Sequence, residues 1–521
     1  MKKRKIYFIL MMIIILLSLN ITTFAIIDTQ ANNGTITITG LEAGVKVYFY
    51  KLTTVDYNSD TDQLQDPAYT WVEEIRSWIK ENYPDYIDEA NDSVTDSFSD
   101  EIVESSTATS FYSKLASAIK GGECDLSVSF EGYTDGDPEY PVTSENTVSS
   151  ITASNLDMGT YLIIIENGYR VYTPVVANLL PEYDEESESW ILNNVVTSAK
   201  STAISISKTI EDTEVETDTI NYSTSDIINY KIVADIPTYE EDSISTDYII
   251  TDTIESGISL DESSISVYGI KGTYEAELSD DAYSLKITDN GFVVEFVYEL
   301  ISEYESIKIT YTGGLMKDSS LVLSEEGNIN SAILIYSNNP YSEDSLIYQA
   351  SNKVTVYTYG IELQKVDKNS GESLTGAEFN LLDSKGTAMY FIYVEGIYYP
   401  ANATDTDSTS TLIVDDEGML YIYGLDAGKY VLEETKAPAG YLIATNTVTI
   451  KIVDDNLDGI IDDDTDAIYS IKFTNTESFV LPVTGGIGSI IFTIIGIIFI
   501  AIGIFLIIFK IAINKKLQSY K

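Results

Sequence analysis

Short runs in which apolar and polar residues alternate recur along most of this 521-residue chain. β-Branched and aromatic residues dominate the runs, turn residues separate them, and a period of two is that of a half-buried strand. The clearest runs are 35–41, 160–165, 203–210, 230–236, 306–313, 352–360 and 447–453. Many short strands with such spacing predict a mainly β protein built from β-sandwich domains.

Helical periodicity replaces the alternation at two places in the first third of the chain. Two sets of apolar residues each share a helical face: Trp71, Ile75, Trp78 and Ile79, and then Phe111, Leu115, Ala118 and Ile119. Asp66-Pro67 precedes the first set and Gly121-Gly122 follows the second, as helix start and stop signals. We expect two helices whose apolar faces pack on a core.

Both ends of the chain carry membrane-targeting patterns. Residues 487–509 hold no charge, and 23 residues at about 1.5 Å each span a ~30 Å hydrocarbon core. The basic tail that follows predicts a cytoplasmic end. At the start, residues 2–5 are basic, 6–19 are apolar, and Thr23 and Ala25 suit a signal peptidase, which predicts a signal peptide over 1–25; cleavage after Ala31 is the alternative.

Composition excludes several functions for the exported part. The full chain has a formal net charge of −52, and without the eight basic residues of its two ends 22 basic residues face 82 acidic ones, or −60. Such a charge would repel phosphate backbones, so we expect no nucleic-acid partner. The single cysteine, Cys124, cannot form an internal disulfide, and the chain has no histidine for a zinc site or a Ser-His-Asp triad. We therefore expect no enzyme turnover, no metal and no cofactor.

Blocks of alternation divide the exported chain into three. Boundaries fall where one block ends and a new strand opens with a lysine, which gives domains over 26–199, 200–357 and 358–478, and a sorting region over 479–521. In the third block, strand parity places Lys365 with Ile361 and Leu363, facing the core. Parity likewise turns Glu434 and Asn475 inward. A buried lysine without a partner is costly.

The stretch YVLEETKAPAGY (430–441) resembles the E-box, YxLxETxAPxGY, of the collagen-binding-protein B-type domain found in Gram-positive surface proteins. The resemblance implies an immunoglobulin-like, B-type β-sandwich. It also implies that Lys365 attacks the carboxamide of Asn475 with help from Glu434, which expels ammonia and leaves an isopeptide bond. Burial is compatible with this chemistry, because it favours the neutral amine and the neutral acid. A buried Lys365–Glu434 ion pair without a bond is the alternative.

In the middle block, ISISKTIED (204–212) carries Lys208 on the first strand, YIITDTIESGISL (248–260) carries Asp252, and LIYSNNPY (334–341) carries Asn338 near the last strand. This arrangement is similar to the middle domain of sortase-assembled major pilins, with an aspartate as the helper. That resemblance implies a bond between Lys208 and Asn338, assisted by Asp252. Asn339 competes with Asn338 for the bond, and an ordinary sandwich without a crosslink is the alternative.

A sorting signal matches the pattern read by sortases: a pentapeptide, the apolar span and the basic tail. The pentapeptide residues are Leu481, Pro482, Val483, Thr484 and Gly485. The resemblance implies cleavage between Thr484 and Gly485 and transfer of Thr484 to an amine. It implies a cell-surface protein covalently attached to the peptidoglycan of a Gram-positive bacterium, whose precursor spans the membrane.

Residues 190–200, WILNNVVTSAK, resemble the WxxxVxVxPK segment that supplies the acceptor lysine in major pilins. The spacing is one residue longer, and Ala199 stands where proline is expected. Lys200 is the predicted intersubunit amine, and a solvated linker lysine is the alternative. The predicted function is the shaft subunit of a sortase-polymerised pilus. Its partners would be sortase, identical subunits in a covalent homopolymer, peptidoglycan, minor pilins and host matrix; a monomeric wall-anchored adhesin is the rival.

An acidic loop over 454–466 opens like a calcium loop, with Asp454, Asn456, Asp458 and Gly459. Thr465 stands where a bidentate glutamate belongs. A solvated hairpin tip is therefore favoured over a calcium site.

Overall fold

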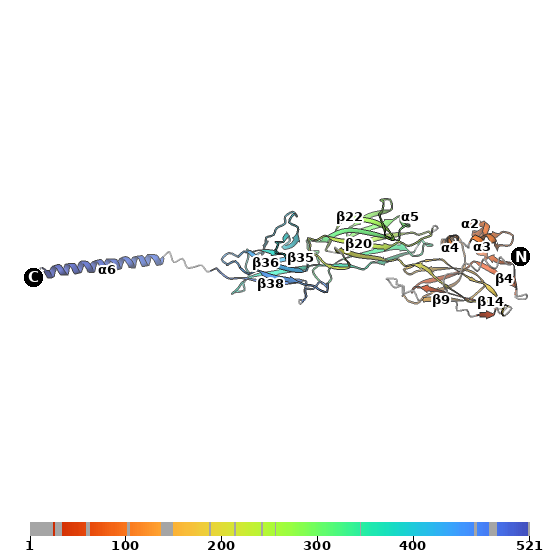
Figure 1. Ribbon diagram of the computed structural model, residues 1–521, viewed down its shortest axis with the longest axis horizontal. Helices are drawn as coiled ribbons and strands as arrows, with labels where there is room; N and C mark the ends of the chain where they lie inside the picture. The colour runs from red at the N-terminus through yellow and green to blue at the C-terminus, as the bar shows by residue number, and fades with distance from the viewer. Residues whose placement is uncertain are drawn as a thin grey trace.

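The computed structural model describes residues 24–26, 34–58, 63–101, 105–136, 149–186, 189–212, 215–240, 243–255, 257–343, 345–462, 466–478 and 487–518. Three β-rich domains follow one another along the long axis, and helix α6 (Ile487–Gln518) lies beyond the third (Figure 1). The prediction of a mainly β chain of sandwich domains, the first with added helices, is confirmed.

The first domain packs two sheets around one apolar cluster. Their orders are β12-β10-β3-β8 and β15-β2-β9. The strands are β2 (Gly34–Leu41), β3 (Lys46–Lys51), β8 (Val128–Tyr133), β9 (Ser149–Leu156), β10 (Gly159–Glu166), β12 (Val175–Leu179) and β15 (Val195–Ser198). Smaller sheets join β1 (Phe24–Ile26), β13 (Pro181–Asp184) and β14 (Ser189–Asn193), and pair β11 (Val171–Thr173) with β16 (Lys200–Thr202).

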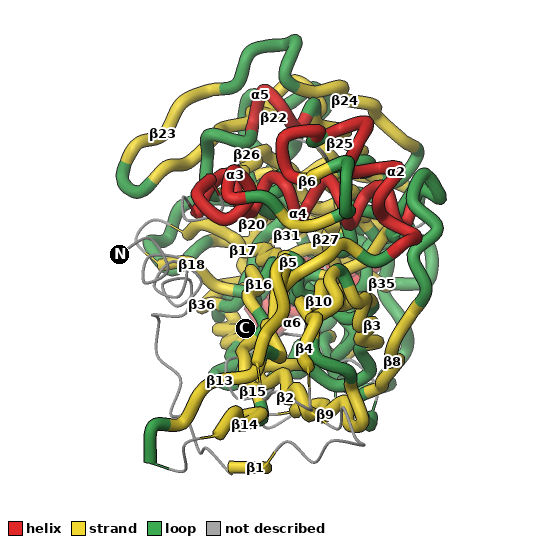
Figure 2. The backbone as a smooth tube through the Cα atoms, turned by 90° about the vertical axis from the view of Figure 1, so that its right-hand side faces the viewer, coloured by secondary structure: helices red, strands yellow, loops and turns green. Residues whose placement is uncertain are grey.

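A helical layer covers part of this domain. Figure 2 shows α2, α3 and α4 gathered on one side of it. The elements are α2 (Glu73–Asn82), η1 (Pro84–Tyr86), α3 (Asp96–Glu101) and α4 (Ser105–Lys120), with a small sheet of β4 (Thr53–Asn58), β5 (Gln63–Trp71), β6 (Ile87–Asp88) and β7 (Ser93–Val94). Leu115 is fully buried in a second apolar cluster, and the helix predicted around it is confirmed.

The prediction that Trp71 belongs to the first helix is wrong. Trp71 ends strand β5, where it pairs with Thr53, and α2 begins only at Glu73. Its indole N–H donates to the carbonyl of Tyr86 over 2.9 Å, so the ring shares the core with Ile75 without sharing its helix. The apolar spacing from Trp71 to Ile79 looked like one helical face, but it runs from the end of strand β5 into helix α2.

The middle domain is a sandwich of two larger sheets around its own cluster. The first sheet contains β17 (Ile206–Asp212), β18 (Val215–Thr217), β20 (Ile228–Asp235), β22 (Ile258–Lys271), β23 (Tyr274–Glu277) and β26 (Ser306–Leu315). The second contains β19 (Thr219–Asn221), β21 (Tyr248–Ile254), β24 (Tyr283–Thr288), β25 (Gly291–Phe296), β27 (Asn328–Ser337), β28 (Leu346–Ala350) and β29 (Val354–Tyr357). A single helical turn, α5 (Tyr298–Ile301), precedes β26.

The third domain is a smaller sandwich whose first and last strands are parallel neighbours. One sheet contains β30 (Tyr359–Asp367), β32 (Tyr390–Val394), β33 (Ile397–Ala401), β35 (Met419–Leu425) and β38 (Ile468–Asn475). The facing sheet contains β31 (Glu378–Leu382), β34 (Leu412–Ile413), β36 (Gly428–Lys436) and β37 (Val448–Ile452).

The loop after β27 of the middle domain packs against the first domain. Tyr341 is 2% exposed and packs in the cluster formed by the helical layer, where its hydroxyl lies 3.4 Å from that of Ser113. The hydroxyl of Tyr336 also donates to the carbonyl of Tyr169. Side chains of one domain thus complete the packing of the other.

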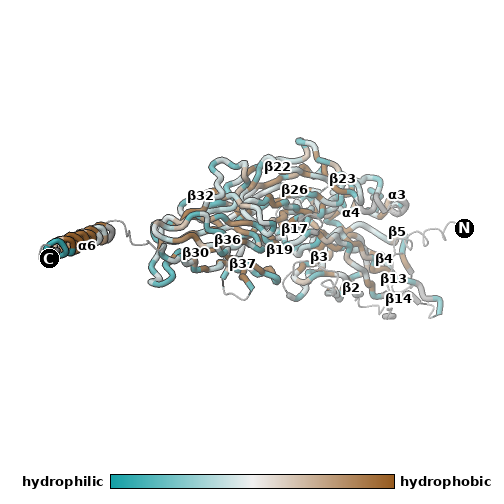
Figure 3. The backbone as a smooth tube through the Cα atoms, turned by 60° about the vertical axis from the view of Figure 1, so that its left-hand side comes forward, coloured by the Kyte–Doolittle hydropathy of each residue, from teal (hydrophilic) through white to brown (hydrophobic). Residues whose placement is uncertain are grey.

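Helix α6 differs from the rest of the described chain in being hydrophobic all round (Figure 3). Its stretch Ile490–Lys516 is long and apolar enough to cross a membrane, judged by length and composition. Lys515 and Lys516 lie in its last turn.

Candidate isopeptide sites

Three buried polar side chains meet inside the third domain. Lys365 comes from β30, Asn475 from its parallel neighbour β38, and Glu434 from β36 of the facing sheet. Their exposed fractions are 0%, 2% and 4%, so all three face the core as strand parity predicts. The three side chains therefore span both sheets at the level where the first and last strands end.

The contacts of these groups suit a reaction between the amine and the amide. Lys365 Nζ donates to Asn475 Oδ1 and lies 3.7 Å from Glu434 Oε1. Asn475 Nδ2 donates to Glu434 Oε2 over 2.9 Å and to the carbonyl of Leu442 over 2.7 Å. The nucleophile touches the carboxamide from one side, and the carboxyl group touches the nitrogen that would leave.

Burial also prepares the Lys365 amine. Desolvation lowers the pKa of Lys365, although the carboxylate of Glu434 acts in the opposite direction. The ring of Phe473, with its centroid 5.2 Å from Nζ, forms part of the apolar surroundings. A lowered pKa raises the share of neutral amine, which is the form able to attack a carbonyl carbon.

A second buried lysine site lies in the middle domain. Lys208 Nζ, on β17, donates to Asp252 Oδ2, on β21 of the facing sheet. It also donates to the hydroxyl of Tyr311, on β26, over 2.6 Å. Burial lowers the pKa of Lys208 to about 8, against the opposite influence of Asp252. Burial raises the pKa of Asp252, which Lys208 opposes.

The structure places the predicted partner of Lys208 elsewhere. Asp252 lies opposite Ala332, and Asn338 is six residues further along, roughly 20 Å in extended chain. Asn338 Nδ2 donates to the carbonyl of Gly168 over 2.8 Å, and Asn339 Nδ2 to Glu166 over 3.0 Å. Both side chains thus bind the first domain. The structure does not bring either asparagine to Lys208, which corrects the predicted pairing.

Asn330, which the sequence pattern did not single out, lies beside the buried lysine site, where the partner of Lys208 was expected. It is fully buried on β27, and its Nδ2 donates over 2.8 Å to the Tyr311 hydroxyl that also contacts Lys208. Its Oδ1 has no hydrogen-bond partner among the described residues. Strand parity turns Asn330 and Asn338 to the same face, so only the register against Asp252 separates them.

Of the remaining predicted sites, the structure describes Lys200 but not the pentapeptide or most of the signal peptide. Lys200 is exposed on β16, opposite Thr173. The pentapeptide Leu481, Pro482, Val483, Thr484 and Gly485 lies outside the described residues, as do residues 1–23 of the predicted signal peptide.

Asp454 in the acidic loop is buried and already hydrogen-bonded by its surroundings. It accepts from the hydroxyl of Tyr359 over 2.6 Å and from the backbone N–H of Gly459 over 2.8 Å. Within the described ranges, no group of three or more acidic or cysteine side chains is arranged to hold a metal ion. The loop connects β37 to β38, which belong to different sheets, and Asp454 is buried, so the expectation of a solvated hairpin tip is wrong.

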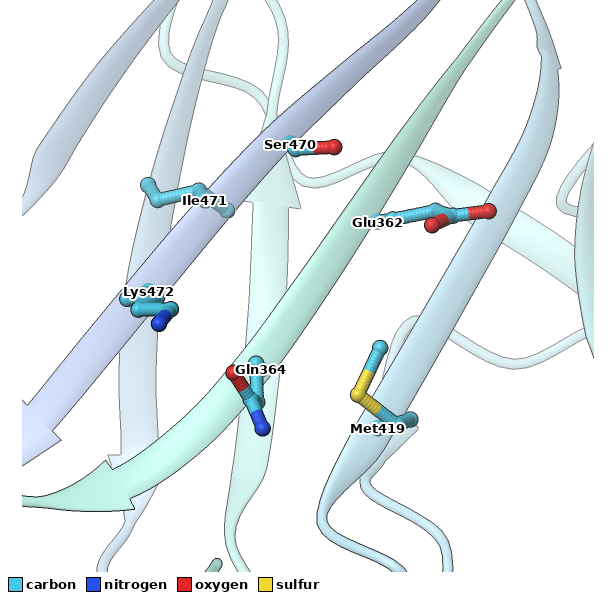
Figure 4. Close-up of a pocket in the computed structure, with 6 residues that line it drawn as sticks. All are labelled: Glu362, Gln364, Met419, Ser470, Ile471 and Lys472. Atoms are coloured by element: carbon cyan, nitrogen blue, oxygen red, sulfur yellow. The ribbon is translucent and has the colours of Figure 1, made fainter. Parts of the chain in front are cut away.

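A hollow of about 280 Å³ lies on the outer side of the third domain (Figure 4). Its lining is Glu362, Gln364, Met419, Ser470, Ile471 and Lys472. Glu362 and Gln364 have the opposite parity to Lys365 on β30, so the hollow is separated from the buried lysine by the sheet.

Comparison with known proteins agrees with this architecture. Residues 359–466 match the SpaA domain family, described as a prealbumin-like fold domain. The T6 backbone pilin of serotype M6 Streptococcus pyogenes, a modular three-domain structure, superimposes with a TM-score of 0.56; it is 20% identical, and the match covers 82% of this chain and 81% of that one. The chain has the fold of a major pilin.

Further matches extend this pilin likeness. The full-length major pilin SpaD from Corynebacterium diphtheriae gives a TM-score of 0.50 at 19% identity, over 86% of this chain and 98% of that one. In sequence, the trypsin-resistant surface T6 protein of Streptococcus pyogenes serotype M6 is 25% identical over 311 residues, or 54% of this chain. The chain spans about half the length of that curated relative, 53%.

Proposed function

We propose that this protein is the shaft subunit of a sortase-polymerised pilus, and that its middle and third domains are each closed by a self-formed Lys–Asn isopeptide bond. The observation that carries the proposal is the buried contact of Lys365 with Asn475 and Glu434 across the first and last strands of one domain. The pilin fold and the C-terminal apolar helix support it.

The bond chemistry is balanced within the chain. A bond forms between Lys365 Nζ and Asn475 Cγ, the Cγ–Nδ2 bond breaks, and the released nitrogen leaves as ammonia. Glu434, which contacts Nδ2, supplies and recovers protons during the step. The corresponding bond in the middle domain joins Lys208 to Asn330, with Asp252 as the acid. Each bond forms once per molecule, so the protein is not a turnover enzyme.

Polymerisation and anchoring require groups outside these sites. Sortase would cleave after Thr484 and pass that residue to Lys200 of the next subunit, or to peptidoglycan at the base. Lys200 fits the role because its side chain is exposed, whereas Lys208 and Lys365 are fully buried. Minor pilins and host matrix are further proposed partners at the cell surface.

Two measurements test the proposal. Intact mass spectrometry of the exported region should show the loss of two ammonia molecules relative to the sequence, and peptide mapping should locate both crosslinks. An antibody blot of cell-wall extracts should show a ladder of covalent polymers. A full sequence mass would overturn the bonds, and a single monomer band would overturn the shaft in favour of a wall-anchored adhesin.

A further inference from the structure

One hydroxyl group contacts all three reactive side chains of the middle-domain site. Tyr311 Oη accepts from Lys208 Nζ over 2.6 Å and from Asn330 Nδ2 over 2.8 Å. It donates to Asp252 Oδ2 over 2.8 Å. A phenol has one proton and two lone pairs, so these three bonds use its whole capacity. The hydroxyl therefore lies between the attacking nitrogen and the leaving nitrogen.

Packing fixes the Tyr311 ring in this position. The side chain is 2% exposed, stacks on Tyr230 with centroids 5.1 Å apart, and meets the edge of Phe292 at 5.2 Å. Burial also raises the pKa of Tyr311 well above its ordinary value, so the hydroxyl keeps its proton. A rigid, protonated hydroxyl at this point can both accept and give a proton.

We propose that Tyr311 is a catalytic residue of the middle-domain reaction, relaying a proton from Lys208 Nζ to Asn330 Nδ2. The inference rests on the proposed Lys208–Asn330 bond. It adds a hydroxyl relay to the buried lysine, asparagine and acid, and the third-domain site shows no tyrosine hydroxyl bonded to Lys365 among its described contacts.

The sequence of proton movements follows from the contacts. The Lys208 ammonium first gives a proton to Asp252, which leaves a neutral amine and a neutral acid. The neutral acid accepts the Tyr311 hydrogen bond more weakly than the carboxylate does. Its new O–H can donate to Asn330 Oδ1. Both Asp252 Oδ1 and Asn330 Oδ1 are buried without hydrogen-bond partners in the described structure. Asp252 pairs with Ala332, which shares a strand face with Asn330 two residues away, so a proton on Asp252 would have an acceptor on the same face.

Bond exchange then proceeds around the Tyr311 hydroxyl. As Lys208 Nζ bonds to Asn330 Cγ, Oη takes a proton from Nζ and passes its own proton to Nδ2. The Cγ–Nδ2 bond breaks and ammonia departs, while Tyr311 regains its starting form. A leaving Nδ2 that received no proton would depart as an amide anion, which is a far poorer leaving group than ammonia.

The test is Tyr311→Phe in the complete exported chain, which retains the ring and removes only the hydroxyl. We expect middle-domain crosslinking, followed by intact mass and peptide mapping after synthesis, to slow by about 100-fold, a typical proton-transfer effect. Tyr248→Phe is the matched control, because Tyr248 is equally buried in the same domain and its hydroxyl donates to the backbone carbonyl of Ala234. The Lys365–Asn475 bond should form normally in both variants.

The outcomes separate this inference from the bond on which it rests. A wild-type chain without the Lys208–Asn330 crosslink overturns the bond itself. A wild-type crosslink that forms equally fast in Tyr311→Phe overturns the relay alone. If Tyr311→Phe does not fold, 3,5-difluorotyrosine at the same position lowers the pKa of the hydroxyl while nearly keeping its shape; an unchanged crosslinking rate would then refute the relay.

Discussion

Replacing Glu434 by glutamine isolates the proposed acid of the third domain. The glutamine side chain has nearly the same size and could still accept the hydrogen bond from Asn475 Nδ2, but it has no carboxyl proton to give. We expect the Glu434→Gln domain to fold without forming its isopeptide bond. Its mass should therefore exceed that of the wild type by one ammonia, beyond the small change from the substitution.

The loss of stability can be worked from the length of the closed loop. Lys365 and Asn475 are 110 residues apart, and the chain-entropy relation for a crosslink gives about 4.8 kcal/mol for such a loop. A domain of roughly this length unfolds with an entropy that makes 1 kcal/mol equal to about 4 °C. The third domain of the variant should thus melt about 20 °C lower than the linked domain.

Calorimetry of the exported chain, paired with intact mass, provides the assay. Glu433→Gln is the matched control, because Glu433 is the exposed neighbour on the same strand and should leave the bond and the melting temperature unchanged. An ammonia loss that persists in Glu434→Gln would refute the role of Glu434. A lost bond with an unchanged melting temperature would refute the entropic reasoning.

The remaining sites yield three further predictions. Lys200→Ala should collapse the polymer ladder on a wall-extract blot while both ammonia losses remain, and a branched peptide at a different lysine would reject Lys200. Asn330→Ala should remove one ammonia loss and Asn338→Ala neither, as read by intact mass; the reverse result would restore the original pairing. Tyr341→Ala deletes a buried ring from the first-domain cluster, a change that costs about 3–5 kcal/mol, and faster hydrogen exchange in the adjoining helices would report it. Unchanged exchange there would show that this ring does not hold the two domains together.

The third-domain site could be predicted from the sequence because its signals are local. The parity of β30 turns Lys365 inward, and the E-box residues around Glu434 form one continuous stretch. Asn475 ends the last strand of the domain, so its position required no knowledge of strand register. All three side chains are brought together as expected.

The middle-domain partner could not be predicted in the same way. Asn330 and Asn338 have the same parity along the chain, so the choice of the partner of Lys208 depends on the register between β21 and β27. That register is set by pairing between distant strands, which local periodicity does not contain. Asn338 and Tyr341 contact the first domain. The pattern of the middle block alone could not predict contacts with a different domain.

The parallel pairing of β30 with β38 determines how this domain would respond to stretching. With the proposed bond in place, tension entering at Tyr359 passes along six residues to Lys365, crosses to Asn475 and leaves the domain. The chain between those two residues lies outside the force path, however well or poorly it is folded. Such a domain cannot lengthen by unravelling, so a filament of these subunits would act as a cable of fixed length and transmit a pull at its tip undiminished to the cell wall.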